Sequence, residues 1–317
     1  MKIIEFCFHA MNHIKRIFTI PNGVKRNLPQ DSSIYVEEKI DGFNIRLLAL
    51  GGKILGFSRG GFLDRFVTEK VSELKLEKFF ADHPDKILCG EMIGNTPYTE
   101  PAKDFDVRLF VFDIDDGSGN YLPCQERYAI LKRYGIDGVP FLGRFEATDL
   151  QGLKKVALAL NKGKREGMVL KTADRKSAVK YVTPEADIED IAHESALFFD
   201  MPLGFYYQRI LRSAISIKDF EFDRKEYSRR LGNAFYEGLE LALKNAEKGE
   251  PIEKEFEIRI RDLTVWDSIK KHMSREVKID ELWRREENGK TKIRFRKIYK
   301  KTTKILTSYL AGKAITD

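Results

Sequence analysis

Short runs of β-branched and aromatic residues, separated by Gly, Asp and Asn turns, dominate the chain before Pro184. This alternation predicts strands. Helical periodicity falls between the strands. The predicted strands are 34–40, 43–50, 53–57, 87–93, 108–114, 168–171 and 178–182, and the predicted helices are 66–80, 125–134 and 150–161. Because the helices do not alternate regularly with the strands, the pattern indicates a mostly antiparallel α+β domain rather than a βαβ array.

After Pro184 the pattern becomes mainly helical. Tyr227, Leu231, Phe235, Leu239 and Ala242 recur at helical spacing and predict one amphipathic helix, whose apolar stripe is most simply a core face. A strand over 255–261, a hairpin at 288–289 with a return strand over 293–298, and a helix over 299–311 complete the chain. We therefore expect three parts: 1–185, a helical part over 186–250, and a small basic part over 251–317.

Charge and composition narrow the functional classes. The 317 residues carry a net charge of +7, and the segment from Thr291 onward contains eight Lys and Arg against one Asp. Such an excess suits polyanions, although a solvated face is the more common meaning of a charge run. Three widely spaced cysteines form neither a disulfide framework nor a metal half-site. With no apolar run long enough for a membrane span and no signal-peptide pattern, we expect a cytoplasmic protein without membrane contact. Four glutamines and many ion-pairing residues favour a thermophilic source.

The segment EKIDGFNIR, residues 38–46, carries the strongest chemical signal. Locally it has two interpretations. One is a hairpin turn with a solvated lysine. The other is a nucleophilic Lys39, which would need burial or neighbouring cations, such as Arg46, to favour its neutral amine. Asp41 could hydrogen-bond that lysine or orient a metal-bound water.

Five further segments follow in a fixed order: SRGG (58–61), GEMIG (90–94), FVFDI (110–114), EGMVLK (166–171) and AVKYV (178–182). Together with Lys-x-Asp-Gly at 39–42, they resemble the motifs of the covalent nucleotidyltransferases, the superfamily of DNA ligases, RNA ligases and RNA capping enzymes. The resemblance covers about the first 185 residues. It implies an antiparallel-sheet, ATP-grasp-like nucleotidyltransferase domain.

The resemblance also implies roles for individual residues. Lys39 would be the nucleophile, assisted by Asp41 and Lys180, and Glu166 would bind the metal. The expected nucleotide-binding residues are Glu38, Asn44, Arg46, Arg59, Glu91, Phe112, Lys171 and Lys180. Among these, Glu91 would bind the ribose hydroxyls and Phe112 would stack on the purine. Relatives often carry two alternating lysines in the last motif, whereas here Ala178 stands two residues before Lys180. Lys171 and Lys180 are therefore expected to share the phosphate role.

Within the superfamily the chain looks most like the archaeal homodimeric ATP-dependent RNA ligases. Asn44, five residues after the lysine, is typical of RNA ligases, and the helical pattern after Pro184 does not predict the five-stranded barrel that follows in DNA ligases and capping enzymes. The implied cofactors are ATP and Mg²⁺ or Mn²⁺. The implied partners are single-stranded RNA ends, with single-stranded DNA kept open, and a second copy of the chain in a helical dimerisation module. The dimer rests on this resemblance and on the apolar stripe at Leu231, Phe235 and Leu239, which is otherwise core within the chain. The alternatives are a DNA ligase or capping-type enzyme on the same fold, and a catalytically silent RNA-binding homodimer.

Overall fold

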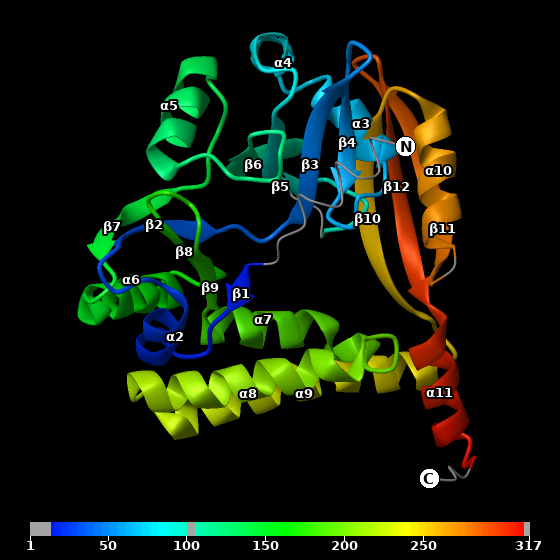
Figure 1. Cartoon of the computed structure of the whole chain (residues 1–317). Helices are drawn as coiled ribbons and strands as arrows, with labels where there is room; N and C mark the ends of the chain where they lie inside the picture. The colour runs from blue at the N-terminus through cyan, green and yellow to red at the C-terminus, as the bar shows by residue number, and fades with distance from the viewer. Residues whose placement is uncertain (1–13, 100–104, 275, 314–317) are drawn as a thin grey trace.

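The computed structural model describes residues 14–99, 105–274 and 276–313. Its N-terminal part consists of two sheets, one above the other in Figure 1. The lower sheet has the order β1-β9-β8-β2-β7 and is antiparallel except where β1 runs parallel to β9. The upper sheet has the order β4-β3-β5-β6 and is antiparallel throughout. The strands are β1 (Lys15–Arg16), β2 (Ser33–Lys39), β3 (Phe43–Leu50), β4 (Lys53–Ser58), β5 (Ile87–Gly94), β6 (Val107–Asp115), β7 (Phe141–Glu146), β8 (Gly167–Thr172) and β9 (Ala178–Val182). The seven predicted strands and the mixed α+β class are confirmed.

Five helices cover these sheets: α2 (Ile20–Asn27), α3 (Arg65–Val71), α4 (Glu77–Asp82), α5 (Cys124–Tyr134) and α6 (Leu150–Lys162). The last two confirm the predicted helices. The single helix predicted over 66–80 is wrong, because the chain there forms α3 and α4. Between them Lys75 has a φ of 53°, a left-handed conformation that interrupts a helix.

A layer of helices lies beneath the lower sheet (Figure 1). It contains α7 (Pro184–Glu194), the 3₁₀ turn η1 (Ser195–Leu197), α8 (Leu203–Phe220) and α9 (Arg224–Glu247). On α9, Tyr227, Leu231 and Phe235 pack in one cluster with Ile188 and Ile191 of α7. The predicted stripe is therefore core within the chain, and it leaves no free apolar face at these three positions.

The C-terminal part is the three-stranded sheet β10-β12-β11 with two helices. Its elements are β10 (Ile252–Ile260), α10 (Leu263–Met273), β11 (Lys278–Glu287), β12 (Lys290–Tyr299) and α11 (Lys300–Leu310). The predicted hairpin is confirmed: Asn288 and Gly289 both have positive φ, as a two-residue type I′ turn requires. This sheet shares one hydrophobic core with the upper sheet, where Phe256 and Trp266 join Leu47 and Phe66 in the same cluster. The C-terminal part therefore completes the core of the upper sheet.

The basic residues of β12 are largely neutralised by acidic neighbours. The ion pairs join Lys292 to Glu257, Arg294 to Glu255, and Arg296 to both Glu253 and Asp280. Part of the excess positive charge near the C-terminus is thus neutralised within the sheet. Among the described residues, no helix is long and apolar enough to cross a membrane.

Candidate active site

The two N-terminal sheets meet at a cleft, and the segment that links β2 to β3 crosses from one sheet to the other beside it. Nine of the predicted site residues line this cleft: Glu38, Lys39, Asn44, Arg46, Arg59, Glu91, Phe112, Lys171 and Lys180. Glu166 does not line it but contacts Lys39 directly. Asp41 also lies outside the lining, and its side chain is exposed in the turn between β2 and β3.

Two glycines allow neighbouring backbone segments to approach each other closely beside the cleft. A Cβ on Gly42 would lie 2.6 Å from the carbonyl oxygen of Met92, so only glycine lets the crossing segment pass β5. Gly167 has a φ of 156°, and a Cβ there would lie 2.0 Å from the carbonyl oxygen of Tyr181. Each glycine follows a chemically important acid in sequence, Asp41 and Glu166. Close backbone approach is thus the physical reason for both the Asp-Gly and the Glu-Gly pairs.

Strand register brings the reactive groups together. Lys39 ends β2 opposite Gly167 of β8, so Glu166 is one residue from that pairing, and Lys180 of β9 pairs with Val169 of the same strand. The Nζ of Lys39 forms an ion pair with Oε1 of Glu166, and both side chains are about one-fifth exposed. Lys39 is therefore held at the cleft by a carboxylate while remaining accessible.

Burial raises the pKa of Glu166 to about 7, although Lys39 opposes the shift. Burial also lowers the pKa of Lys180 to about 8, and the positive charges of Lys39, Arg16 and Arg59 lower it further. Both groups therefore titrate near neutral pH, which is characteristic of groups that exchange protons or bind charged substrates. Arg16, on β1 opposite Lys180, was not predicted, because the two-residue strand that carries it has no periodicity to detect.

A hydrogen-bonded row of polar groups lies on the upper sheet. Asn44 Nδ2 donates to Glu91 Oε2 at 3.1 Å, and Arg46 Nη1 donates to Asn44 Oδ1 at 2.8 Å. The guanidinium carbon of Arg46 lies 5.4 Å from the ring centroid of Phe112. This wall presents a carboxylate, a cation and an aromatic ring to the same cavity.

The floor of the cleft is a buried charge network. Lys171, whose side chain is 1% exposed, forms ion pairs with Glu37 at 2.7 Å and Asp113 at 3.1 Å, and its Nζ also donates to the carbonyl oxygen of Phe112 at 2.5 Å. Arg127 pairs with Glu37, and Arg175 makes two bonds to Asp113, at 2.6 and 2.8 Å. Burial and the neighbouring Arg127 lower the pKa of Lys171. The amine of Lys171 is thus already surrounded by protein partners.

Sequence reasoning missed Arg175 and Asp113 as lining residues. Arg175 lies in the turn between β8 and β9, with a φ of 61°, and its guanidinium stacks 4.5 Å from the centroid of Tyr121. For Asp113, the available signal in the sequence was its position directly after the predicted site residue Phe112. Glu38, which was predicted, lines the cleft but is also ion-paired with Arg165.

Comparisons with known proteins agree with this geometry. A family model described as RNA ligase matches residues 32–182, and a second, described as the C-terminal region of the ligase Pab1020, matches residues 193–313. A Methanocaldococcus jannaschii protein of uncharacterised function, MJ0414, is 30% identical over 297 residues, which are 88% of this chain and 75% of that protein. The chain belongs to the RNA ligase family.

Solved structures place the RNA ligase fold on almost the whole chain. The structure of an archaeal ATP-dependent RNA ligase is 26% identical, with a TM-score of 0.87 over 96% of this chain and 83% of that one. An Aquifex aeolicus protein, provisionally assigned as an ATP-dependent DNA ligase, is 27% identical, with a TM-score of 0.89 over 96% of this chain and 86% of that one. The predicted relationship to the nucleotidyltransferase superfamily, including its archaeal RNA ligases, is thus confirmed, and membership assigns this chain to the ligases.

The RNA ligase family implies a divalent metal, and one buried oxygen beside the cleft fits it. Oε2 of Glu166 is buried and has no hydrogen-bond partner, so a cation beside it would satisfy an otherwise isolated anionic oxygen. Among the described residues no group of three or more His, Cys, Asp or Glu has metal-binding geometry. A single carboxylate still suits Mg²⁺, which is commonly held by one or two carboxylates together with substrate phosphates and water.

Proposed function

We propose that this protein is an ATP-dependent RNA ligase that joins a 5′-phosphate to a 3′-hydroxyl through three nucleotidyl transfers. Nζ of Lys39 attacks the α-phosphorus of ATP, forms the lysyl-AMP bond and releases pyrophosphate. A 5′-phosphate oxygen of RNA then attacks the same phosphorus and frees Lys39. Finally a 3′-hydroxyl attacks the activated 5′-phosphate, forms the phosphodiester and releases AMP.

The contact between Lys39 and Glu166 carries this proposal. An amine must lose a proton before it attacks phosphorus. Glu166 is positioned to receive that proton, because it contacts Nζ and its pKa is raised to about 7 by burial. Lys180 supplies positive charge near the transferred phosphate, which suits a reaction that depends mainly on positioning and charge neutralisation. A divalent cation bound beside Glu166 would add to that neutralisation.

The upper-sheet wall suits a nucleoside. Glu91 can accept hydrogen bonds from ribose hydroxyls, and its position is fixed by Asn44. Phe112 offers a ring face for a purine, with Arg46 nearby. Burial raises the pKa of Glu91 because its carboxylate has lost contact with water. A ribose hydroxyl that donates a hydrogen bond to this carboxylate would replace part of the lost solvation.

Intact-protein mass spectrometry tests the first step. Wild type incubated with ATP and Mg²⁺ should gain one AMP, and Lys39→Met should gain none. Lys155→Met, which alters an exposed lysine on α6, is the matched control and should be adenylated like wild type. Protein isolated with AMP already attached is first treated with pyrophosphate, which reverses the step.

An AMP adduct on Lys39→Met would exclude Lys39 as the nucleophile. An adduct from GTP instead of ATP would favour capping-type chemistry. No adduct with either nucleotide would favour a silent RNA-binding protein and would overturn the proposal.

RNA rather than DNA is proposed as the substrate because Asn44 is part of the hydrogen-bonded row and because an archaeal relative of the same fold is an RNA ligase. The Aquifex relative makes DNA the specific competitor. Sealing of matched single-stranded RNA and DNA by the adenylated protein separates the two, and preferential DNA sealing would overturn the choice. ATP and RNA as substrates support the expected cytoplasmic location.

We also infer a homodimer, formed through α8 rather than through the stripe on α9. Tyr207, Ile210 and Leu211 lie on one face of α8 and are 72%, 40% and 54% exposed. A second copy would cover this face, as the family resemblance implies. Light scattering at micromolar concentration should give the dimer mass for wild type and the monomer mass for Leu211→Glu, and a monomeric wild type would remove the inference.

A further inference from the structure

A second groove lies between the upper sheet and α10 of the C-terminal part. Its walls include Phe43, Phe62 and Leu63 on one side and Ile269 and His272 on the other. Phe62 is 74% exposed and Leu63 is 54% exposed, so two adjacent apolar side chains face solvent at the same place. An exposed apolar pair that lines a groove is more informative than single exposed residues, because it marks a surface suited to a ligand.

The base of this groove is rigid. The ring of Phe43 stacks on that of Tyr98 with centroids 4.1 Å apart, and the hydroxyl of Tyr98 donates to Asp64 at 2.6 Å. Asp64 also caps α3 by accepting from the backbone N–H of Val67. Asp64, the one acidic side chain among the described residues that line the groove, is thus already engaged, and the stacked rings of Phe43 and Tyr98 form a preformed part of the lining.

One tight turn joins the groove to the candidate active site. The N–H of Ser58 donates to the carbonyl oxygen of Phe62, and the N–H of Gly61 donates to that of Ser58, each at 2.9 Å. Arg59 of this turn lines the active-site cleft, whereas Phe62 lines the second groove. Three residues span at most about 11 Å of chain, so a ligand strand leaving the cleft past Arg59 reaches Phe62 within a few nucleotides.

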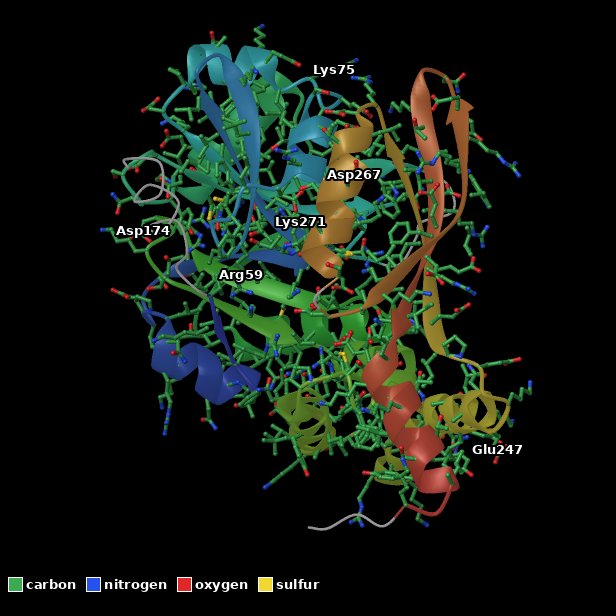
Figure 2. All side chains as sticks on the ribbon, turned by 90° about the vertical axis from the view of Figure 1, so that its right-hand side faces the viewer. Arg59, Lys75, Asp174, Glu247, Asp267 and Lys271 are labelled. Atoms are coloured by element: carbon green, nitrogen blue, oxygen red, sulfur yellow. The ribbon has the colours of Figure 1, made fainter. Side chains whose placement is uncertain are left out.

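The rim of the groove is basic. Arg65 at the start of α3 is exposed, and Lys271 and His272 lie in the last turn of α10, where both are exposed. Of these basic residues, Arg65 and His272 line the groove, and Figure 2 labels Lys271 on α10. Cations around an exposed aromatic ring are the combination with which proteins hold single-stranded nucleic acid.

We propose that this groove holds the single-stranded RNA next to the joint, with one base stacked on Phe62. The inference rests on the proposed ligase function and adds a substrate-binding site to it. Continuity with the cleft and the basic rim favour RNA over a peptide. Stacking tolerates any base, so this site would bind RNA without sequence preference.

Substitution of Phe62 tests the site with single-stranded, 5′-phosphorylated RNA as the probe. Phe62→Ala should weaken RNA binding, measured by fluorescence anisotropy, between about 5-fold and 160-fold, the range typical of losing one stacked base. Phe62→Leu should lose a similar amount because it keeps apolar volume but has no ring face, while Phe62→Trp should bind as wild type does. Tyr236→Ala, which removes a 65% exposed ring from α9, is the matched control and should bind normally.

Two further readouts separate this inference from the proposed function. AMP-adduct formation needs no RNA, so Phe62→Ala should be adenylated at the wild-type rate while sealing more slowly at subsaturating RNA. Lys271→Gln should reduce the slope of log affinity against log salt by about 0.7, the value for one phosphate contact on a single strand.

Unchanged RNA affinity in Phe62→Ala would overturn the inference and would leave a peptide as the occupant of the groove. Wild-type affinity in Phe62→Leu would overturn stacking as the mode of binding. Absence of an AMP adduct in wild type would refute the proposed ligase reaction, whereas the binding measurements would still judge the groove.

Discussion

Two lysines on the neighbouring antiparallel strands β2 and β8 line the same cleft but differ in their exposure to solvent and in their partners. Lys39, at the end of β2, is about one-fifth exposed and has one carboxylate partner, Glu166, whose second oxygen is unsatisfied. Lys171, on β8, is 1% exposed and is surrounded by two carboxylates and a backbone carbonyl. Two lysines on paired strands of one sheet thus belong to one open ion pair and one buried network.

The difference separates reactive from structural charge. The amine of Lys171 already has three protein partners and so has no donor left for a substrate, and removing it would leave buried charges without compensation. In the pair of Lys39 and Glu166, Oε2 of Glu166 has no hydrogen-bond partner, and the pKa of Glu166 is raised to about 7. Glu166 can therefore exchange a proton or bind a cation without disturbing the fold. We therefore assign chemistry to the Lys39 side of the cleft and rigidity to the Lys171 floor.

The same substitution at both lysines tests this assignment most strongly. Lys39→Met should abolish the AMP adduct and change the unfolding midpoint little. Lys171→Met should lower the free energy of unfolding by about 3 kcal/mol, because Glu37 and Asp113 lose a buried partner, yet folded protein should still form the adduct. Denaturant titration and intact mass on both variants make the comparison.

The opposite outcome for Lys171→Met would reverse this conclusion. If Lys171→Met removed the adduct without loss of stability, Lys171 would contact the nucleotide phosphates, as the sequence predicted.

Glu166→Gln should give the next largest effect. It removes the negative charge from the unsatisfied oxygen, so adenylation in single-turnover experiments should slow about 1000-fold or more, as expected when several kcal/mol of charge stabilisation is lost. Stability at pH 8 should not fall. The pKa of Glu166 is raised in the folded state, so its ionised form opposes folding above the unfolded value.

Glu189→Gln, at an exposed position on α7, provides the control for loss of an acid and should be adenylated normally. Wild-type adenylation by Glu166→Gln would mean that the open pair holds Lys39 in place and does nothing more.

The open side of the cleft was largely predictable from the sequence, and the closed side was not. Lys39 and Lys180 stand on strands that the sequence pattern predicts, and the resemblance to the nucleotidyltransferases singled them out. Antiparallel pairing of both strands with β8 brings them together. Alternation also places Val169 and Lys171 on the cleft face of β8. It cannot give the depth of Lys171, because that depends on Arg127 and Asp113, which other elements supply.

Two features of the fold were also beyond the sequence pattern. Strand β7 (Phe141–Glu146) is exposed along much of its length and interrupted by Gly143, so neither alternation nor an apolar run identifies it. The shared core of the upper and C-terminal sheets could not be predicted for a different reason. The alternation of β10 shows that one face is buried, but nothing local shows that Leu47 and Phe66 cover it.

The pH dependence of adenylation sharpens the comparison at a smaller scale. At subsaturating ATP the rate should rise about tenfold per pH unit below pH 7, as Glu166 ionises, and should fall above pH 8, as Lys180 loses its proton. Lys180→Arg should move only the alkaline limb to higher pH, because the guanidinium stays charged. A flat profile between pH 6 and 9 would show that neither group titrates in the rate-limiting step.

The smallest effect should come from the ion pair at the edge of the cleft. Arg165 is 53% exposed where it pairs with Glu38, so Arg165→Gln should cost less than about 1 kcal/mol of stability, and high salt should erase the difference. ATP affinity, measured by calorimetry, should stay within about threefold of wild type, since the exposed partner screens Glu38 only weakly. A loss as large as that of Lys171→Met would mean that Glu38 belongs to the closed network beside its neighbour Glu37, and that the boundary between reactive and structural charge runs through Lys39 itself.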